Sequence, residues 1–239
     1  RDAMTQVVYI SKTVSLRGGY NGDLTLWDPD TYPTTLDAQG QGRVVSIVGS
    51  GAGPTLEGLT ITGGNAQGIT ANCPTYVGQS DGCGGGVFVR SAHPVIANNV
   101  VTGNVGGVSS GARSTDGGGL CLVYASGAVI TGNLVISNTA SLGNRGVGGG
   151  VALSFAYNVV MESNRVFSNV ATVHATFAGH GGGIAIEGSG AAPTIKDNLI
   201  VGNRTNGGGT WHGGGIYNWY SSSNFDGNRV VGNYGESAV

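Results

Sequence analysis

Apolar residues recur along the chain in short alternating stretches. A Gly-Gly-Gly triplet followed by an aliphatic residue opens five of them, at residues 87–89, 120–122, 151–153, 184–186 and 216–218. The first and third positions are apolar except at Asn218, whereas the middle position is mixed. This period of two predicts short β-strands whose outer positions face a core and whose middle position faces outward.

Two further apolar columns follow each of these strands. One comprises Ile96, Ile130, Met161, Ile195 and Phe225, and the other comprises Val101, Val135, Val166, Ile200 and Val230. Both are expected to point inward. Each repeat is therefore predicted to contain three short strands and one variable loop, with no amphipathic helix between them.

Glycine and asparagine mark this repeat at regular intervals. The Gly triplets begin at Gly84, Gly117, Gly148, Gly181 and Gly213, and pairs of Asn separated by four residues begin at Asn99, Asn133, Asn164, Asn198 and Asn228. Parallel strands without helical crossovers require the chain to wind as a solenoid, with coils roughly 4.8 Å apart. Asn tolerates left-handed turns, and its amide can form a stacked ladder between coils.

These motifs resemble the repeats of the right-handed parallel β-helix proteins of the pectate-lyase-like superfamily. Segments 15–20 and 35–44 are also typical of them. The repeats are similar in style to those of Gly/Asn-rich secreted bacterial surface proteins, such as polymorphic outer-membrane proteins and adhesin passenger domains. The resemblance implies a secreted or cell-surface location. It also implies, as a possibility, action on polysaccharides through paired carboxylates, or through a basic residue that often works with calcium.

The predicted fold is therefore all-β, a single-stranded right-handed parallel β-helix of about six to seven coils of roughly 30–40 residues, with long loops at one corner. Residues 1–239 are expected to form one domain. Within it, residues 1–43 form an N-terminal coil with an irregular loop at 20–34, residues 44–233 form the repeated coils, and residues 234–239 form an uncapped C-terminal end.

Composition narrows the classes of function. Glycine accounts for 47 residues, only 10% of residues are charged, and the formal net charge is -2. Lys12 and Lys196 are the only lysines, so no basic stripe is available for nucleic acid. No apolar run is long enough to predict a membrane span.

Three residues are candidates for catalysis. One outward column reads Glu57, Ala97, Thr131, Glu162, Lys196 and Asp226. Paired-carboxylate hydrolysis needs two nearby acids, and no two adjacent coils supply them here. The favoured interpretation is an exposed salt-bridge ladder of Glu162, Lys196 and Asp226, with a polysaccharide lyase site as the alternative.

Histidines and cysteines suggest two further sites. His180 and His212 precede consecutive Gly triplets, so they are candidates for a metal site; closing turns through backbone hydrogen bonds is the favoured alternative. No cofactor is otherwise expected. Cys73 and Cys83 bracket a short loop and are predicted to form a disulfide, the alternative being unpaired thiols. Cys121 is left free in either case.

Four aromatic residues form the predicted ligand-binding set. Tyr124, Phe155, Trp219 and Tyr220 follow the strands after the Gly triplets and could stack on sugar rings, or could be buried beneath loops. The first functional hypothesis is a scaffold that binds carbohydrate, a surface partner or copies of itself. Self-association would join uncapped ends head to tail into filaments. The alternative is a polysaccharide lyase or glycoside hydrolase.

Overall fold

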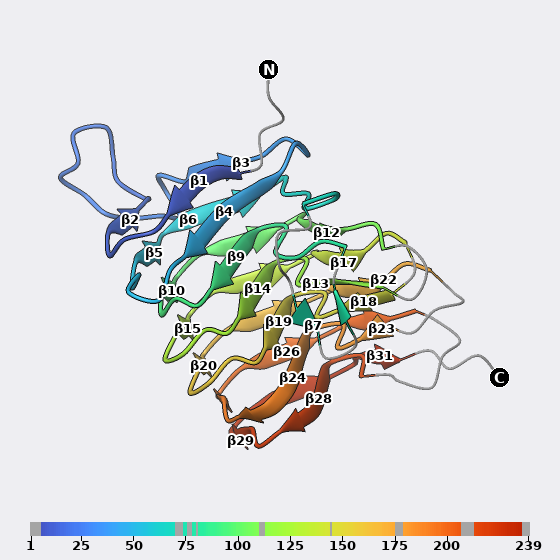
Figure 1. Ribbon diagram of the computed structural model, residues 1–239. Coiled ribbons are helices and arrows are strands. Elements are labelled where there is room, and N and C mark those ends of the chain that lie inside the picture. Colours follow the sequence, from blue (N-terminus) through green and yellow to red (C-terminus); the bar gives the residue numbers. More distant parts are fainter. Residues whose placement is uncertain are drawn as a thin grey trace.

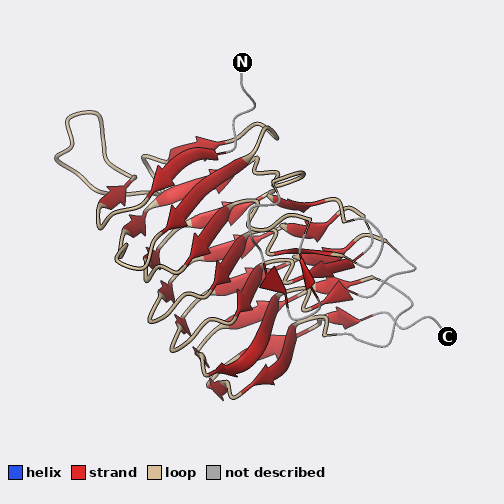
Figure 2. Cartoon of the chain, in the orientation of Figure 1, coloured by secondary structure: helices blue, strands red, loops and turns tan. Residues whose placement is uncertain are grey.

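The computed structural model describes residues 6–69, 74–75, 78–79, 81–109, 113–143, 145–174, 179–206 and 213–235. Of residues 74–75, 78–79 and 189–191 it describes the backbone alone. Within these ranges the fold is all-β, and successive coils stack along one axis (Figures 1 and 2).

Three seven-stranded parallel sheets run the length of the stack. Sheet 1 contains β1 (Gln6–Ile10), β4 (Arg43–Val48), β9 (Val87–Arg90), β14 (Leu120–Val123), β19 (Val151–Ser154), β24 (Ile184–Ala191) and β28 (Ile216–Ser221). Sheet 2 contains β2 (Ser15–Arg17), β5 (Thr55–Glu57), β10 (Val95–Ala97), β15 (Val129–Thr131), β20 (Val160–Glu162), β25 (Thr194–Lys196) and β29 (Asn224–Asp226). Sheet 3 contains β3 (Thr34–Asp37), β6 (Leu59–Thr62), β11 (Val100–Thr102), β16 (Leu134–Ile136), β21 (Arg165–Phe167), β26 (Leu199–Val201) and β30 (Arg229–Val231). The predicted parallel β-helix is confirmed.

The variable loops contain more structure than the sequence pattern predicts. Sheet 4 contains β12 (Val105–Gly107), β17 (Thr139–Ser141), β22 (Val170–Thr172), β27 (Arg204–Thr205) and β31 (Tyr234–Gly235). Sheet 5 contains β13 (Ser114–Asp116), β18 (Arg145–Val147) and β23 (Gly179–His180), and β7 (Pro74–Thr75) pairs with β8 (Gly78–Gln79). The expectation of three strands per coil was too low, because the strands of sheets 4 and 5 lack the column of large apolar residues that marks sheets 2 and 3 in the sequence.

The interior columns lie where alternation placed them. Val101 pairs in register with Val135, Val135 with Val166, Val166 with Ile200, and Ile200 with Val230. The first four of these side chains are fully buried, whereas Val230 is 47% exposed because no described coil covers it.

Two ladders of buried asparagines close the corners on either side of sheet 3. The Asn164 amide nitrogen donates to the carbonyls of Ile130 and Glu162, each at 2.9 Å, and to the Asn198 side-chain oxygen, also at 2.9 Å. In turn, the Asn164 side-chain oxygen accepts hydrogen bonds from the backbone and side-chain nitrogens of Asn133. Asn133, Asn164 and Asn198 are each 1% exposed, so the predicted ladder is confirmed.

The middle positions of sheet 1 face outward as predicted, but they are buried and not solvated. Phe88, Cys121, Ala152 and Ala185 point away from the interior column but are at most 2% exposed. Most of them pack with Cys83 and Val123 in a second apolar cluster on the outer side of the sheet. Alternation predicts which side of a strand a residue occupies, but not what covers that side.

We expect Asn164→Ala to destabilise the protein by at least about 3 kcal/mol, because it leaves several buried donors and acceptors unpaired. Val166→Ala, two residues away in the same coil, removes only apolar contacts and should cost on the order of 1 to 3 kcal/mol. Denaturant unfolding of the two variants measures both values. An Asn164→Ala variant no less stable than Val166→Ala would contradict the structural role of the ladder.

Candidate functional site

Aromatic residues occupy the corner where the chain leaves sheet 1 for sheet 2. Tyr124, Phe155 and Tyr220 stand at equivalent positions on three coils, with φ angles of 51°, 50° and 49°. Ser91 and Gly188 hold the same position on two other coils, also at positive φ. Bulky side chains rarely adopt this left-handed conformation, so the protein tolerates strained backbone at a surface position.

We call Tyr124, Phe155, Tyr157, Trp219 and Tyr220 the aromatic ridge. The rings of Tyr124 and Phe155 stack with centroids 5.5 Å apart, and those of Trp219 and Tyr220 meet edge to face at 5.1 Å. Tyr124 is 42% exposed, Tyr157 is 38% exposed and Tyr220 is 60% exposed, while Phe155 and Trp219 are half-buried. All four rings named from the sequence thus keep exposed surface along one corner.

Gly188 makes room for the ridge. A Cβ atom at this position would lie 2.9 Å from both the backbone nitrogen and the Cδ1 atom of Phe155. The Phe155 ring therefore lies over the coil that contains Gly188, and no side chain from Gly188 interrupts the surface between Phe155 and Tyr220.

The three catalytic candidates lie on the outer face of sheet 2. Lys196 Nζ is 2.7 Å from Glu162 Oε2, and Lys196 pairs in register with Asp226. The hydrogen bond to Glu162 is the main cause of a raised pKa for Lys196. In the same column Arg17 Nε donates to Glu57 at 2.7 Å. This geometry fits an exposed ladder of alternating charges, because adjacent coils in the column do not both carry acids.

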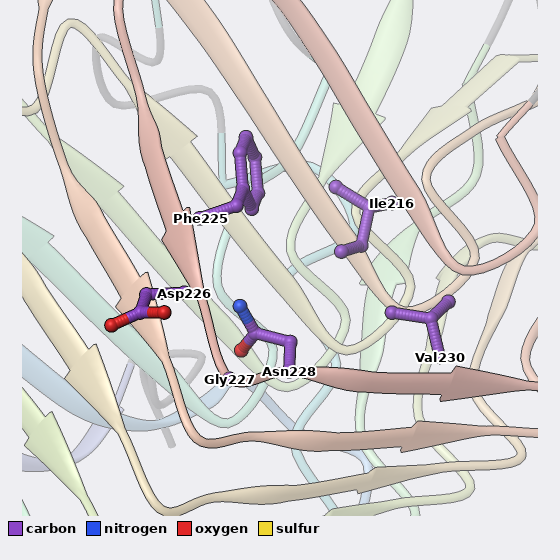
Figure 3. A pocket seen from close by; sticks show the side chains of 6 residues that line it. All are labelled: Ile216, Phe225, Asp226, Gly227, Asn228 and Val230. Carbon is purple, nitrogen blue, oxygen red and sulfur yellow. The ribbon is translucent and has the colours of Figure 1, made fainter.

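A hollow of about 310 Å³ lies at the last described coil, lined by Ile216, Phe225, Asp226, Gly227, Asn228 and Val230 (Figure 3). Ile216, Phe225 and Val230 belong to the inward columns, so the hollow is the uncovered end of the apolar interior. Figure 3 shows Phe225 and Asp226 on opposite sides of their strand. The catalytic candidates therefore do not converge on this hollow.

Sequence reasoning missed a group of ionisable side chains on the outer side of sheet 1. We call Asp116, Arg145, His180, Glu187 and Tyr217 the buried polar cluster. His180 Nδ1 is 3.7 Å from Glu187 Oε1, and the His180 ring lies 4.6 Å from that of Tyr217. Asp116, His180 and Glu187 are at most 2% exposed. Alternation places Glu187 on the outer side of its strand but does not encode what covers that side, so the sequence does not indicate this burial.

Burial dominates the electrostatics of this cluster. It raises the pKa of the Asp116 carboxyl well above its ordinary value, and the negative charge of Glu187 adds to the shift. It also raises the pKa of Tyr217 to about 12 and that of the Cys121 thiol well above its usual range. Neutral forms of these groups are favoured because each is removed from water.

The metal and disulfide predictions each involve one residue outside the described ranges. His212 lies outside the described residues, so its predicted pairing with His180 stays a prediction. In the described part of the chain no three His, Cys, Asp or Glu side chains are grouped to hold a metal ion. Cys83 is disulfide-bonded and Cys121 is a buried free thiol, whereas Cys73 lies outside the described residues.

Comparison with known proteins identifies the class of protein. A family model described as a right handed beta helix region matches residues 43–234, and the chain therefore belongs to this family. No curated protein and no solved structure gives a significant match to the chain. Among the described residues, no helix has the length and apolar character needed to cross a membrane.

We expect Asp116→Asn to stabilise the protein at pH 8 and to lose this advantage as the pH falls towards 4. The raised pKa means that folded Asp116 holds a proton that the unfolded chain releases above about pH 4, so its contribution to stability falls as the pH rises towards the folded pKa. Asparagine mimics the neutral acid at every pH. Thermal melting across this range measures the difference, with the exposed Asp226→Asn as control. A difference that does not change with pH would argue against this burial effect.

Proposed function

We propose that this β-helix is a secreted or cell-surface scaffold that binds carbohydrate along the aromatic ridge. The observation that carries the proposal is the set of rings at equivalent left-handed positions on three of four successive coils, Tyr124 and Tyr220 being exposed and Phe155 half-buried. Backbone strain retained at an exposed position is a reason to infer a function for it, since a smaller side chain would avoid crowding there.

Aromatic rings suit this ligand because they offer a flat, rigid apolar surface with little conformational entropy to lose. The C–H face of a pyranose ring packs on such a surface, while its hydroxyl groups remain available to water and polar neighbours. Tyr124, Tyr157 and Tyr220 each add a phenolic hydroxyl that can donate to or accept from a sugar hydroxyl.

Binding is favoured over catalysis by the state of the acidic groups. Glu162 is held in an ion pair with Lys196, and Asp116 and Glu187 are each 1% exposed. Asp226 is exposed, but the neighbouring coil of its column carries Lys196 and not a second acid. A polysaccharide lyase or glycoside hydrolase of the pectate-lyase-like superfamily is the alternative, and release of new chain ends from the same glycans would favour it.

Replacement of Tyr124 or Tyr220 by alanine should weaken glycan binding about three- to tenfold per ring, because each ring contributes on the order of 1 kcal/mol of stacking. A glycan array followed by affinity electrophoresis measures the change. Tyr234→Ala removes a ring that is 70% exposed on sheet 4, and it should leave binding unaltered. The absence of any bound glycan, or an equal loss in the Tyr234 variant, would count against the ridge as the binding surface.

A second candidate function is self-assembly at the C-terminal edge. Phe225, Val230 and Val231 are between 41% and 47% exposed there, around the hollow described above. Strand edges with unpaired backbone groups and apolar neighbours favour pairing with another strand. We propose that a second copy supplies its first coil, formed by β1, β2 and β3, as a parallel extension of the stack.

Head-to-tail pairing should appear as filaments that lengthen with protein concentration, because this contact does not close on itself. Sedimentation velocity and electron microscopy measure it. Phe225→Asp should shift the population to monomer, since it places a charge in the contact. A monodisperse monomer at high concentration would exclude the pairing, and it would leave carbohydrate binding untouched.

A further inference from the structure

We infer that the ligand of the aromatic ridge is a neutral linear polysaccharide whose chain runs along the solenoid axis. This inference rests on the proposed carbohydrate binding and adds to it the charge and the direction of the ligand.

The neutral character follows from the residues around the ridge. The segments that join sheet 1 to sheet 2, at residues 91–94, 124–128, 155–159, 188–193 and 220–223, contain no Asp, Glu, Lys or Arg. Recognition of a uronate or a sulfated sugar relies on guanidinium or ammonium groups that pair with the anion. Arg90 is half-buried on the coil before Tyr124 and pairs in register with Val123, so it lies beside one end of the ridge and not between its rings. Glu187 is an acid and is buried.

Uncharged polar side chains take the place of those ions. Ser126 and Asn158 are exposed beside Tyr124 and Tyr157, and Ser222 is exposed beside Tyr220. Hydroxyl and amide groups match the donors and acceptors of sugar hydroxyls without requiring a charged partner. A few polar groups around an apolar platform are the usual composition of a small-molecule site.

The direction follows from the placement of the rings. Val123, Ser154, Glu187 and Trp219 pair in register across sheet 1, so the residues that follow them lie along the solenoid axis. The register shifts between Glu187 and Ala191, so this line is irregular at the coil of Gly188. Tyr124 and Phe155 are neighbours in that line, and Tyr220 lies two coils beyond Phe155. A chain laid along the strands would meet one coil, whereas a chain laid along the axis meets all three rings. Coils repeat roughly every 4.8 Å, a distance similar to the length of one sugar ring.

Gly188 accommodates the Phe155 ring in that line. It contributes no side chain between Phe155 and Tyr220, and the space of a Cβ atom at this position is already filled by Phe155.

The test is isothermal titration of the full chain with two sets of oligosaccharides. Cellohexaose, xylohexaose and mannohexaose provide neutral probes, and hexagalacturonate provides an acidic probe of equal length. At least one neutral hexasaccharide should bind, with affinity that falls at least tenfold from hexamer to dimer, and hexagalacturonate should not bind. Preference for hexagalacturonate, lost in Tyr124→Ala, would overturn the neutral ligand and leave carbohydrate binding standing. Failure of every glycan would overturn both.

The direction is tested separately with Tyr124→Ala and Tyr220→Ala, which lie at opposite ends of the ridge. Both variants should weaken the hexasaccharide about three- to tenfold if one chain spans the four coils from Tyr124 to Tyr220. Tyr234→Ala controls for removal of an exposed ring, and the melting temperature of each variant reports its folding. Weakening by only one of the two ridge variants would overturn the axial direction.

Discussion

The structure depends on one constraint: every coil must pass its backbone hydrogen bonds to the next coil, including at the corners where the strands end. Along the sheets, parallel pairing meets this requirement directly. At the corners on either side of sheet 3 the chain turns sharply, and a buried asparagine amide meets it. Asn138 donates to the carbonyls of Val101 and Ile136 and to the Asn169 side chain, so one residue joins three coils. The Gly triplets serve the third corner, where a Cβ atom at Gly149 would lie 2.4 Å from the backbone of the adjoining coils.

The asparagine ladders and the Gly triplets stabilise the stacking of the coils at the other corners. The residue types in the turn from sheet 1 to sheet 2 can therefore vary. The turn from sheet 1 to sheet 2 has no asparagine ladder, and serine, tyrosine, phenylalanine and glycine occupy its left-handed position on successive coils. Variation at a position that the fold does not constrain is the situation in which a solenoid acquires a binding surface. The aromatic ridge lies at this corner.

The outer side of sheet 1 is the least expected part of the molecule. A single-layer solenoid leaves the outward residues of its strands in water, and sheets 2 and 3 follow this rule. On the inner strands β9, β14, β19 and β24 of sheet 1 most outward residues are covered, and an apolar cluster with Cys83 and Cys121 lies beside Asp116, His180 and Glu187. Burial of the Asp116 carboxyl costs stability, and its raised pKa favours the neutral form that relieves part of that cost. Asp116, His180 and Glu187 therefore add little exposed charge to the face next to the ridge.

The sequence by itself determined the solenoid, its interior columns and its ladders, because each depends on local properties repeated in every coil. Alternation selects the side of a strand, and Asn and Gly tolerate the turns they mark. It also identified the four aromatic residues of the corner and the ladder of Glu162 and Lys196. Tertiary structure alone decided the rest. The short strands of sheets 4 and 5 arise from stacking rather than from their own periodicity. The burial of Phe88, Asp116 and Glu187 depends on what covers sheet 1, which alternation along a single strand does not encode.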